Sequence, residues 1–223
     1  MPLPTGKVNP YELAKLIFPH LELDDDRVVV GPDVGLDAAV IELPEKMLVL
    51  SSDPITGNLR DPGWLSVHVN ANDVATIGAE PEWFLVNFFL PEGVEEERVE
   101  ELAKQVSRAC EELGVSVVGG HTEVTPGLGR ILISGAMIGE APKDRWVSAA
   151  GAKPGDKIIL TKGVGIEGTF ILAVDREKEL KKALGEDLVN RAMEFREKLS
   201  VVKDALTAIK TGGVNAMHDP TEG

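Results

Sequence analysis

Hydrophobic residues recur with two different periods along the first part of the chain, and the two periods alternate. Short runs rich in Val, Leu and Ile predict β-strands at 27–31, 37–43, 46–53, 82–90, 115–120 and 131–140. Apolar residues spaced by three and four positions predict helices at 9–18, 61–79 and 95–113. This order is typical of an α+β domain in which helices cover one face of a sheet.

The pattern changes between Ala141 and Gly155, where Pro, Gly and Ala are frequent and no hydrophobic period persists. We place a domain boundary here, so that 1–148 form an N-terminal domain and 149–223 begin a C-terminal α/β domain. The second part is predicted to hold a strand at 157–160, a glycine turn, and charged helices from about 169 to 210. The sequence ends on a turn of the kind that opens a helix, so we expect it to be part of a longer protein.

The composition is that of an ordinary globular protein and argues against several functional classes. The net charge of −14 disfavours binding to a nucleic-acid backbone, although acidic proteins commonly bind nucleotides through Mg²⁺. No apolar run approaches the ~20 residues of a membrane span, and the N-terminus lacks the signal-peptide pattern. We therefore expect a cytoplasmic protein. The four histidines show no short metal-ligand spacing, so a structural zinc site is not expected.

The glycines Gly163, Gly165 and Gly168 follow the predicted strand with the spacing of a dinucleotide-binding turn. That interpretation also requires an acidic residue ~20 positions later, at the end of a strand. The corresponding window instead has helical apolar spacing, at Leu188 and Leu199 among others. A dinucleotide site is therefore disfavoured. The glycines either make a tight strand-to-helix turn or face the phosphates of another nucleotide, and both alternatives stay open.

Three aspartates lie at predicted strand ends or in loops, each flanked by apolar residues: Asp37, Asp53 and Asp73. An unpaired carboxylate beside a packed surface is costly, and a shared Mg²⁺ would remove that cost. The alternative is that each aspartate caps a turn or a helix. Three such residues, together with the polar run 119–123 after another strand, favour the metal site.

Five motifs in this order support a family assignment: "DAAVI", "SSDPITG", "VNANDVATIGAEP", "GGHTEVTPG" and "HDPTEG". On them the chain resembles the aminoimidazole-ribonucleotide-synthetase-like superfamily. That superfamily includes the purine-pathway synthetase, thiamine-monophosphate kinase, selenophosphate synthetase and the hydrogenase-maturation carbamoyl dehydratase. The segments "SSDPITG" and "TKGVGIEGT" look most like the hydrogenase-maturation branch and its archaeal relatives.

The resemblance implies a two-domain ATP-dependent enzyme whose N-terminal domains pair in a homodimer. ATP and Mg²⁺ would lie between that dimer layer and the C-terminal domain. By motif position, the implied metal-side residues are Asp37, Asp53, Asp73, Glu123 and Asp219. The implied ATP or phosphate contacts are Asn72, Gly119, Gly120, His121, Thr122, Gly163 and Gly165.

The reaction implied by the resemblance is ATP-dependent phosphorylation of an oxygen. In the dehydratase branch this is a carboxamide oxygen, which is then eliminated to leave a nitrile. Other maturation proteins would be partners of such an enzyme, whereas we expect no nucleic-acid or membrane partner. A small-molecule kinase of the thiamine-monophosphate type is the alternative activity.

The chain departs from the family pattern at three places. Leu36 stands where relatives often carry a second Asp, and His121 stands where the kinase and dehydratase branches carry an Asp. The N-terminal "PLPTGKVNP" lacks the reactive Cys or Sec that the selenophosphate branch requires. Lys7 within it either reaches a phosphate or is a solvated surface lysine, and the second interpretation is favoured. A catalytically weakened dimeric scaffold therefore also stays open.

Overall fold

The computed structural model describes residues 6–21, 24–57 and 60–220 of the chain. The α-helices are α1 (Pro10–Leu16), α2 (Pro62–Thr76), α3 (Glu96–Leu113), α4 (Ile166–Asp175), α5 (Glu177–Leu184), α6 (Glu186–Met193) and α7 (Val202–Thr211). The strands are β1 (Val28–Val30), β2 (Ala39–Glu42), β3 (Lys46–Ser51), β4 (Pro54–Ile55), β5 (Glu80–Leu90), β6 (Ser116–Val124) and β7 (Leu132–Pro142). Short 3-10 turns are η1 (Phe18–His20), η2 (Ala149–Gly151) and η3 (Glu194–Lys198).

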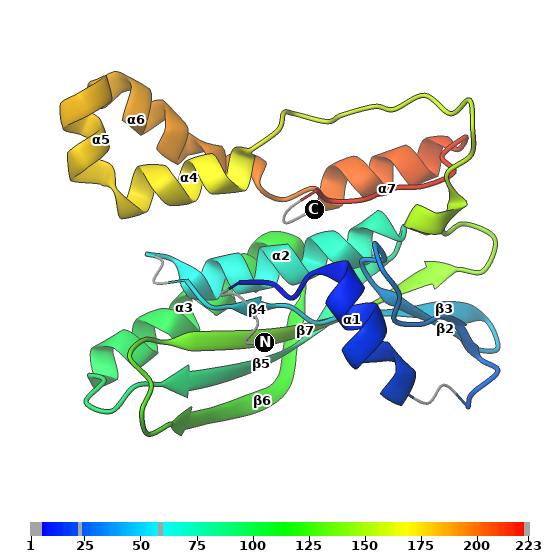
Figure 1. Ribbon diagram of the computed structural model, residues 1–223, viewed down its shortest axis with the longest axis horizontal. Helices are drawn as coiled ribbons and strands as arrows, with labels where there is room; N and C mark the ends of the chain where they lie inside the picture. The colour runs from blue at the N-terminus through cyan, green and yellow to red at the C-terminus, as the bar shows by residue number, and fades with distance from the viewer. Residues whose placement is uncertain (1–5, 22–23, 58–59, 221–223) are drawn as a thin grey trace.

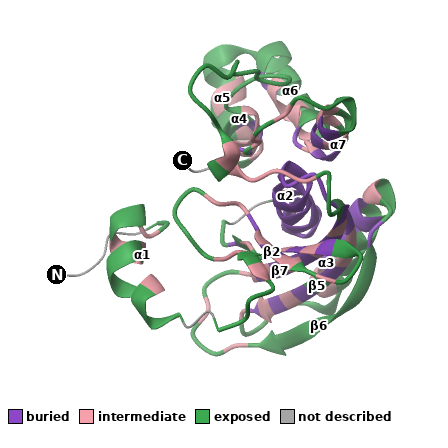
Figure 2. Cartoon of the chain, turned by 90° about the vertical axis from the view of Figure 1, so that its right-hand side faces the viewer, coloured by how far each residue is buried: buried purple, intermediate pink, exposed green. Residues whose placement is uncertain are grey.

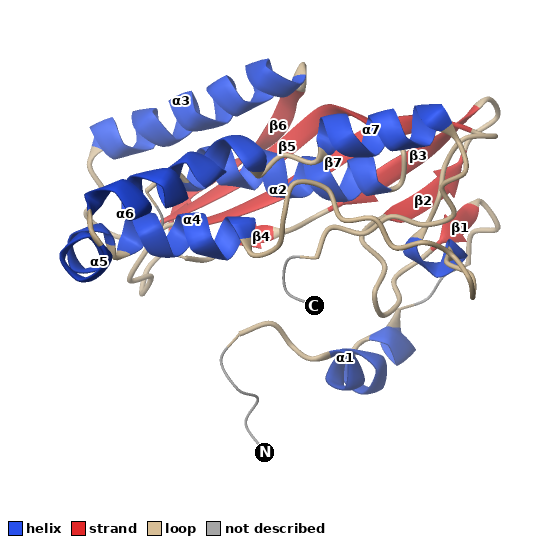
Figure 3. Ribbon diagram, turned by 90° about the horizontal axis from the view of Figure 1, so that it is seen from above, coloured by secondary structure: helices blue, strands red, loops and turns tan. Residues whose placement is uncertain are grey.

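The strands form one mixed sheet in the order β1-β2-β3-β7-β5-β6, with β4 paired to β7 (Figure 1). All neighbouring strands are antiparallel except β5 and β6, which run parallel because α3 connects them. Helix α2 lies on one face of this sheet, and α7 lies on α2 (Figure 1, Figure 3). The predicted α+β class, with helices over one face of a sheet, is confirmed.

One-sided burial in the strands explains this layering. Along β5 and β7, alternate residues are buried, including Phe84, Val86, Ile133 and Met137, while those between them are partly or fully exposed. Such alternation is expected of a sheet that is covered on one face only. Helix α2 is itself almost wholly buried, since the sheet, α3 and α7 surround it (Figure 2).

Two glycines of β7 allow α2 to lie close to the sheet. A Cβ atom at Gly135 would lie 2.6 Å from the Asn70 amide and 2.7 Å from the Phe84 ring. A Cβ atom at Gly139 would lie 2.6 Å from Val74 and closer still to the Glu80 carbonyl oxygen. The position of α2 over the strand ends therefore depends on the absence of side chains at these two positions.

The C-terminal segment is built of helices, of which α7 packs on α2. Helices α4, α5 and α6 project to one side, and α7 returns along α2 (Figure 1). The Asn72 amide of α2 holds the turn before α7, because its Nδ2 donates to the Leu199 carbonyl at 3.1 Å and its Oδ1 accepts from the Val201 N–H at 2.8 Å. Among the helices described, none combines the length and the apolar composition needed to cross a bilayer.

Most predicted elements are confirmed, with boundaries that shift by a few residues. The predicted helix at 9–18 is α1, with Asn9 as its cap: the Asn9 Oδ1 accepts from the Glu12 N–H at 3.0 Å. The predicted helices at 61–79 and 95–113 are α2 and α3, and the charged helices after 169 are α4 to α7. The predicted strand at 115–120 is longer in the structure, where β6 extends to Val124.

The predicted strand at 157–160 is wrong. These residues are extended but join no sheet within the described part of the chain, and Ile158 and Ile159 are 99% and 83% exposed. A strand requires a neighbour that exchanges backbone hydrogen bonds, and no described segment lies beside this one as a strand. Apolar content alone could not supply that information.

Replacing Gly139 with Ala should destabilise the protein, because the new methyl group would meet the Glu80 backbone and Val74. We expect a loss of about 1–3 kcal/mol in the free energy of unfolding, measured by urea denaturation. Gly129→Ala is the matched control, since a Cβ atom there has no neighbour within 4 Å. Equal unfolding midpoints for the two variants would contradict this account of how α2 is seated.

Candidate functional site

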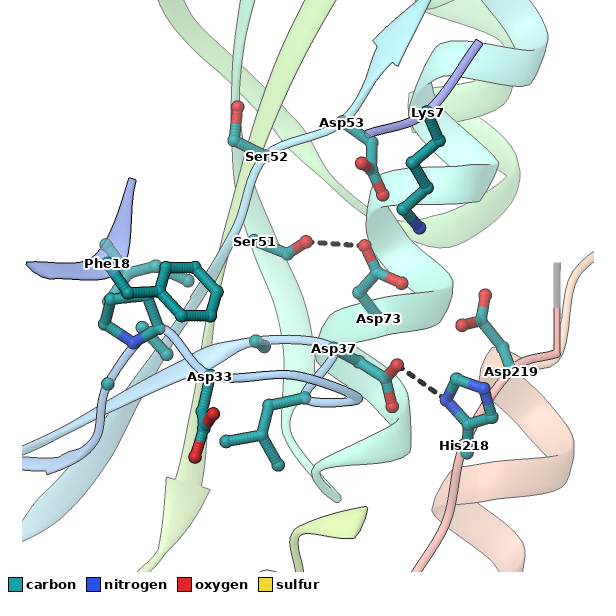
Figure 4. A pocket seen from close by; sticks show the side chains of 16 residues that line it. Lys7, Phe18, Asp33, Asp37, Ser51, Ser52, Asp53, Asp73, His218 and Asp219 are labelled. Carbon is teal, nitrogen blue, oxygen red and sulfur yellow. Dashed lines mark hydrogen bonds and ion pairs between the residues drawn. The ribbon is translucent and has the colours of Figure 1, made fainter. Parts of the chain in front are cut away.

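A cavity of about 370 Å³ lies where the ends of β2 and β3, α2 and the segment after α7 meet (Figure 4). Its charged lining residues are Lys7, Asp33, Asp37, Asp53, Asp73, His218 and Asp219. Phe18, Ser51 and Ser52 add to the wall. The cavity thus brings together the four aspartates predicted as metal ligands, Asp37, Asp53, Asp73 and Asp219. They are far apart in the sequence, since 182 positions separate Asp37 from Asp219.

Asp73 is carried by α2 and faces the end of β3. The Ser51 hydroxyl donates to its Oδ2 at 2.5 Å, and the carboxylate is only 6% exposed. The Asp73 backbone carbonyl in turn accepts from the Thr76 hydroxyl at 2.7 Å, one turn further along the helix. A buried helix and one hydroxyl donor therefore fix this carboxylate in the cavity wall.

Asp53 follows β3 in a loop that is anchored to α2. The Asp53 N–H donates to the Asn70 Oδ1 at 2.8 Å, and the Asn70 Nδ2 donates back to the Asp53 carbonyl at 3.2 Å. The Ser52 hydroxyl donates to the Gly135 carbonyl at 2.7 Å. These bonds hold the loop backbone and leave the Asp53 side chain directed toward the cavity (Figure 4).

Asp37 precedes β2 and meets the C-terminal segment across the cavity. Its Oδ1 lies 2.7 Å from the His218 Nδ1, and its Oδ2 accepts a long bond from the Thr76 hydroxyl at 3.4 Å. Burial raises the pKa of the Asp37 carboxyl group, while the neighbouring His218 opposes that rise. The contact joins residues 181 positions apart.

One carboxylate oxygen of Asp219 lacks a hydrogen-bond partner within the part of the chain that the structure describes. It is 7% exposed, and its Oδ2 is buried with no hydrogen-bond partner among the described atoms. Burial and, next, the negative charge of Asp37 together raise the pKa of Asp219 to about 7. Burial and the charge of Asp219 likewise raise the pKa of Asp73. The carboxylates of this cavity therefore repel one another in a poorly solvated space.

This arrangement fits a divalent cation held mainly by carboxylate oxygens, with one imidazole nitrogen beside them. Ligand atoms of Asp37, His218 and Asp219 all lie within 4.8 Å of one another. A cation would satisfy the orphaned Asp219 Oδ2 and compensate the charge that burial makes unfavourable. The residues present thus fit Mg²⁺, and Asp53 and Asp73 face the same space (Figure 4).

The predicted residues 119–123 lie elsewhere, on the edge strand β6. β5 and β7 separate β6 from β3, and none of Gly119, Gly120, His121, Thr122 and Glu123 lines the cavity. Glu123 instead pairs locally, with His121 Nε2 at 3.1 Å and with the Thr125 hydroxyl at 2.6 Å. A Cβ atom at Gly120 would collide with the Val86 carbonyl, so this glycine serves the close pairing of β6 with β5.

Asn72, Gly163 and Gly165 also lie outside the cavity lining. Both polar ends of the Asn72 side chain are engaged with the backbone before α7, as described above. Gly165 caps the start of α4 with a left-handed backbone, φ +68°, which glycine adopts without strain. The predicted contacts of these residues and of 119–123 with ATP stay predictions.

Sequence reasoning missed several cavity residues. Lys7 is exposed and also lines the cavity, whereas the sequence favoured a solvated lysine over a phosphate contact. Ser51 is the hydrogen-bond donor to Asp73. His218 was treated as one of four unrelated histidines, yet it contacts Asp37. The signal for Ser51 and His218 was present, since each lies within a motif, two positions before Asp53 and one position before Asp219 respectively.

The raised pKa of Asp219 predicts how stability depends on pH without metal. The pKa of Asp219 is about 7 in the folded state and 3.8 ordinarily, so the protonated carboxyl group favours the folded protein. This contribution of Asp219 to the free energy of unfolding is fully present below about pH 4 and is lost as the pH rises through about 7. We expect the melting temperature of metal-free protein to fall between pH 5 and pH 8, and Mg²⁺ to restore it most at pH 8.

The variant Asp219→Asn should flatten that profile and be more stable than the wild type at pH 8 by about 1–3 kcal/mol. Differential scanning calorimetry across the pH range measures this. Asp144→Asn, at an exposed position outside the cavity, is the control and should follow the wild type. Superimposable profiles for wild type and Asp219→Asn would show that this carboxylate is not destabilised by its surroundings.

Two domains of one protein family match the chain. One, described as AIR synthase related protein, N-terminal domain, matches residues 35–141. The other, described as AIR synthase related protein, C-terminal domain, matches residues 153–223. Asp37, Asp53 and Asp73 lie in the first match, and Asp219 lies in the second, so the cavity is lined from both.

Curated relatives include hydrogenase-maturation proteins and a kinase. The chain is 28% identical to a putative hydrogenase expression/formation protein of Methanocaldococcus jannaschii, covering 98% of this chain and 64% of the relative. It is 30% identical to carbamoyl dehydratase HypE of Cupriavidus necator, covering 85% and 54%. It is 29% identical to thiamine-monophosphate kinase of Aquifex aeolicus, covering 76% and 56%. The chain thus spans between 54% and 64% of the lengths of these relatives.

Solved structures share the fold. AaThiL complexed with AMPPCP and TMP aligns with a TM-score of 0.65 at 28% identity, covering 82% of this chain and 59% of that one. Hydrogenase maturation protein HypE in complex with ATP aligns with a TM-score of 0.55 at 29% identity, covering 78% and 52%. The motifs, the fold and both family matches agree, and the chain belongs to the AIR synthase related family.

Proposed function

We propose that this chain is the ATP-binding part of an ATP-dependent enzyme, and that the aspartate-lined cavity holds Mg²⁺ and the nucleotide phosphates. The observation that carries the proposal is the buried carboxylate cluster, in which Asp219 keeps an oxygen without a partner. Homologous HypE in complex with ATP supports the choice of nucleotide. Lys7, the one Lys or Arg among the described lining residues, would face the phosphates.

The residues of the cavity would act mainly by positioning. Asp37, Asp53, Asp73 and Asp219 would hold Mg²⁺, which neutralises phosphate charge during phosphoryl transfer. Ser51 keeps Asp73 oriented by its hydrogen bond, and Asn70 keeps the Asp53 loop in place. We assign no residue of the described chain as an acid or base, since phosphoryl transfer requires little covalent participation by the protein.

The reaction we propose is activation of an oxygen by phosphorylation, as in the hydrogenase-maturation carbamoyl dehydratases. The relatives from Methanocaldococcus jannaschii and Cupriavidus necator support this branch. Other maturation proteins would then be partners. The alignment with AaThiL favours a second candidate, a small-molecule kinase of the thiamine-monophosphate type. ADP release with thiamine monophosphate, without any protein partner, would select the kinase. ADP release that requires a second maturation protein would select the dehydratase.

The MgATP site predicts a strong effect of Asp73→Asn, which keeps the shape of the side chain and removes its charge. We expect MgATP affinity to fall by about 2 kcal/mol or more, roughly 30-fold or more, in isothermal titration calorimetry. Asp53→Ala should have a similar effect. Asp144→Asn, remote from the cavity, should bind as the wild type does. Unchanged titrations for both cavity variants would refute the proposed site.

We propose further that 1–148 form a domain that pairs in a homodimer and that 149–223 belong to a second domain. Support comes from β6, whose nine residues are all exposed and which pairs with β5 alone among the described strands. Val117, Val118 and Val124 give this edge an apolar surface, 48–54% exposed. An uncovered apolar edge strand is a surface prone to pair with another chain.

The dimer proposal is tested by placing a charge on that edge. Val118→Lys should raise the dimer dissociation constant at least ~10-fold, because a lysine on an edge strand opposes pairing. Sedimentation equilibrium measures the change. Leu188→Lys on α6 is the control at a similarly exposed position, 45%, and should remain dimeric. A monomeric wild type, or a fully dimeric Val118→Lys, would rule out this edge as the interface.

A further inference from the structure

Four side chains from three separate elements meet beside the first half of α2, and none of the four lines the aspartate cavity. Trp64 and His68 lie one turn apart on α2 and are only 3% and 2% exposed. Their ring centroids are 3.8 Å apart. Glu112 comes from the last turn of α3, and Arg196 comes from η3 in the C-terminal segment. We call these four residues the Trp64 cluster.

Glu112 determines which nitrogen of His68 carries the proton. Its Oε2 accepts from the Trp64 Nε1–H at 2.9 Å and lies 3.1 Å from the His68 Nε2. Because a carboxylate only accepts, a neutral His68 carries its hydrogen on Nε2 and leaves Nδ1 as a bare acceptor. Nδ1 is buried and has no hydrogen-bond partner among the described atoms. A proton added there would create a second N–H group without an acceptor.

Arg196 attaches η3 to this cluster through the face of Trp64. Its guanidinium carbon lies 3.9 Å from the centroid of the Trp64 ring, which is a cation–π contact. The Arg196 Nε is buried without a hydrogen-bond partner among the described atoms, since the Asp61 Oδ2 is 3.7 Å away. An aromatic face and a long ion pair therefore hold this side chain.

The stretch that begins at Arg196 has a second attachment to α2. Two turns further along that helix, the Asn72 side chain accepts from the Val201 N–H at 2.8 Å and donates to the Leu199 carbonyl at 3.1 Å. Trp64 and Asn72 thus hold one short stretch at two points. Exchange of the Val201 N–H with solvent reports whether this stretch is docked on α2.

His68 is the group of the cluster whose charge affects docking. Burial lowers the pKa of His68 to about 4; the Glu112 carboxylate opposes this fall, and the positive charge of Arg196 adds to it. Glu112 on α3 and Arg196 on η3 are the charged groups that act on His68, while Asp61 at the start of α2 faces Arg196. When η3 leaves α2, the imidazole loses its cationic neighbour. The undocked state therefore binds a proton more readily than the docked state does.

We propose that the Trp64 cluster is an acid-sensitive latch, in which protonation of His68 releases η3 from α2. The sign follows from the lowered pKa, because His68 titrates near 4 when docked and near its ordinary value of 6.5 when released. Docking is fully favoured above about pH 6.5 and is weakened as the pH falls toward about 4. The segment after η3 carries Asp219 to the cavity, so release also loosens the cavity wall. The latch requires neither metal nor nucleotide and goes beyond the proposed function.

The test is hydrogen–deuterium exchange, measured by mass spectrometry on the full chain without metal or nucleotide, at pH 7.5 and pH 5. Rates are corrected for their intrinsic pH dependence. His68→Gln keeps an amide donor for Glu112 and does not titrate. At pH 5 we expect the peptide containing Val201 to be ~10-fold less protected in the wild type than in His68→Gln, and at pH 7.5 the two should agree within ~3-fold. Since the cavity carboxylates are present in both proteins, the comparison isolates the imidazole.

Strands β5 and β7 are the internal reference, and His121→Gln is the matched control. The His121 Nε2 also lies 3.1 Å from a glutamate oxygen, but on the exposed strand β6, so this variant should exchange as the wild type does. Equal protection of the wild type and His68→Gln at pH 5 would overturn the latch. So would a wild-type loss that extends equally through β5 and β7, because it would report global unfolding.

Arg196→Gln tests the other half of the latch, also in the case that His68→Gln fails to fold. We expect protection at Val201 to fall ~3-fold or more already at pH 7.5, because the aromatic face loses its cation. Arg191→Gln, at an exposed position on α6, is the control and should exchange as the wild type does. Undiminished protection in Arg196→Gln would overturn the proposal that this guanidinium holds η3 on α2.

Discussion

The mutual repulsion of buried carboxylates is the constraint on which the rest of this structure depends. Asp37, Asp73 and Asp219 face one cavity from three separate segments, and burial raises the pKa of each. Several buried carboxylates close together destabilise a folded protein unless a positive charge neutralises them. Their presence is explained if a cation and a phosphate group complete the site. The proposed function follows from the negative charge of these carboxylates, which the described protein groups do not neutralise fully.

Helix α2 is the element that holds these carboxylates together despite their repulsion. Helix α2 is held against β7 at Gly135 and Gly139, which fixes the position of Asp73 over the strand ends. Asn72, the residue before Asp73 on the same helix, binds the backbone before α7 and so brings the C-terminal segment to the cavity. One buried helix thus positions a carboxylate and anchors the segment that carries another, and packing in the core is coupled to the geometry of the site.

The sequence allowed much of this to be predicted. Periodicity identified α2, α3 and most strands, and motif order grouped Asp37, Asp53, Asp73 and Asp219. Two kinds of information were inaccessible. Strand status at 157–160 depends on a neighbouring strand, which local composition cannot reveal. The His218–Asp37 contact joins positions 181 apart, so residue spacing gave no sign of it. Likewise, the position of residues 119–123 on the far edge strand follows from sheet order, which the motif could not show.

The central claim is that the aspartate-lined cavity holds a divalent cation and the phosphates of ATP. The most direct measurement is a crystal structure of the chain grown with Mn²⁺ and a non-hydrolysable ATP analogue, with the metal located by anomalous scattering. The account predicts an anomalous peak within bonding distance of Asp219 and its neighbours in the cavity, next to phosphate density. A peak on β6 beside Glu123 with none in the cavity, or nucleotide bound elsewhere, would contradict it.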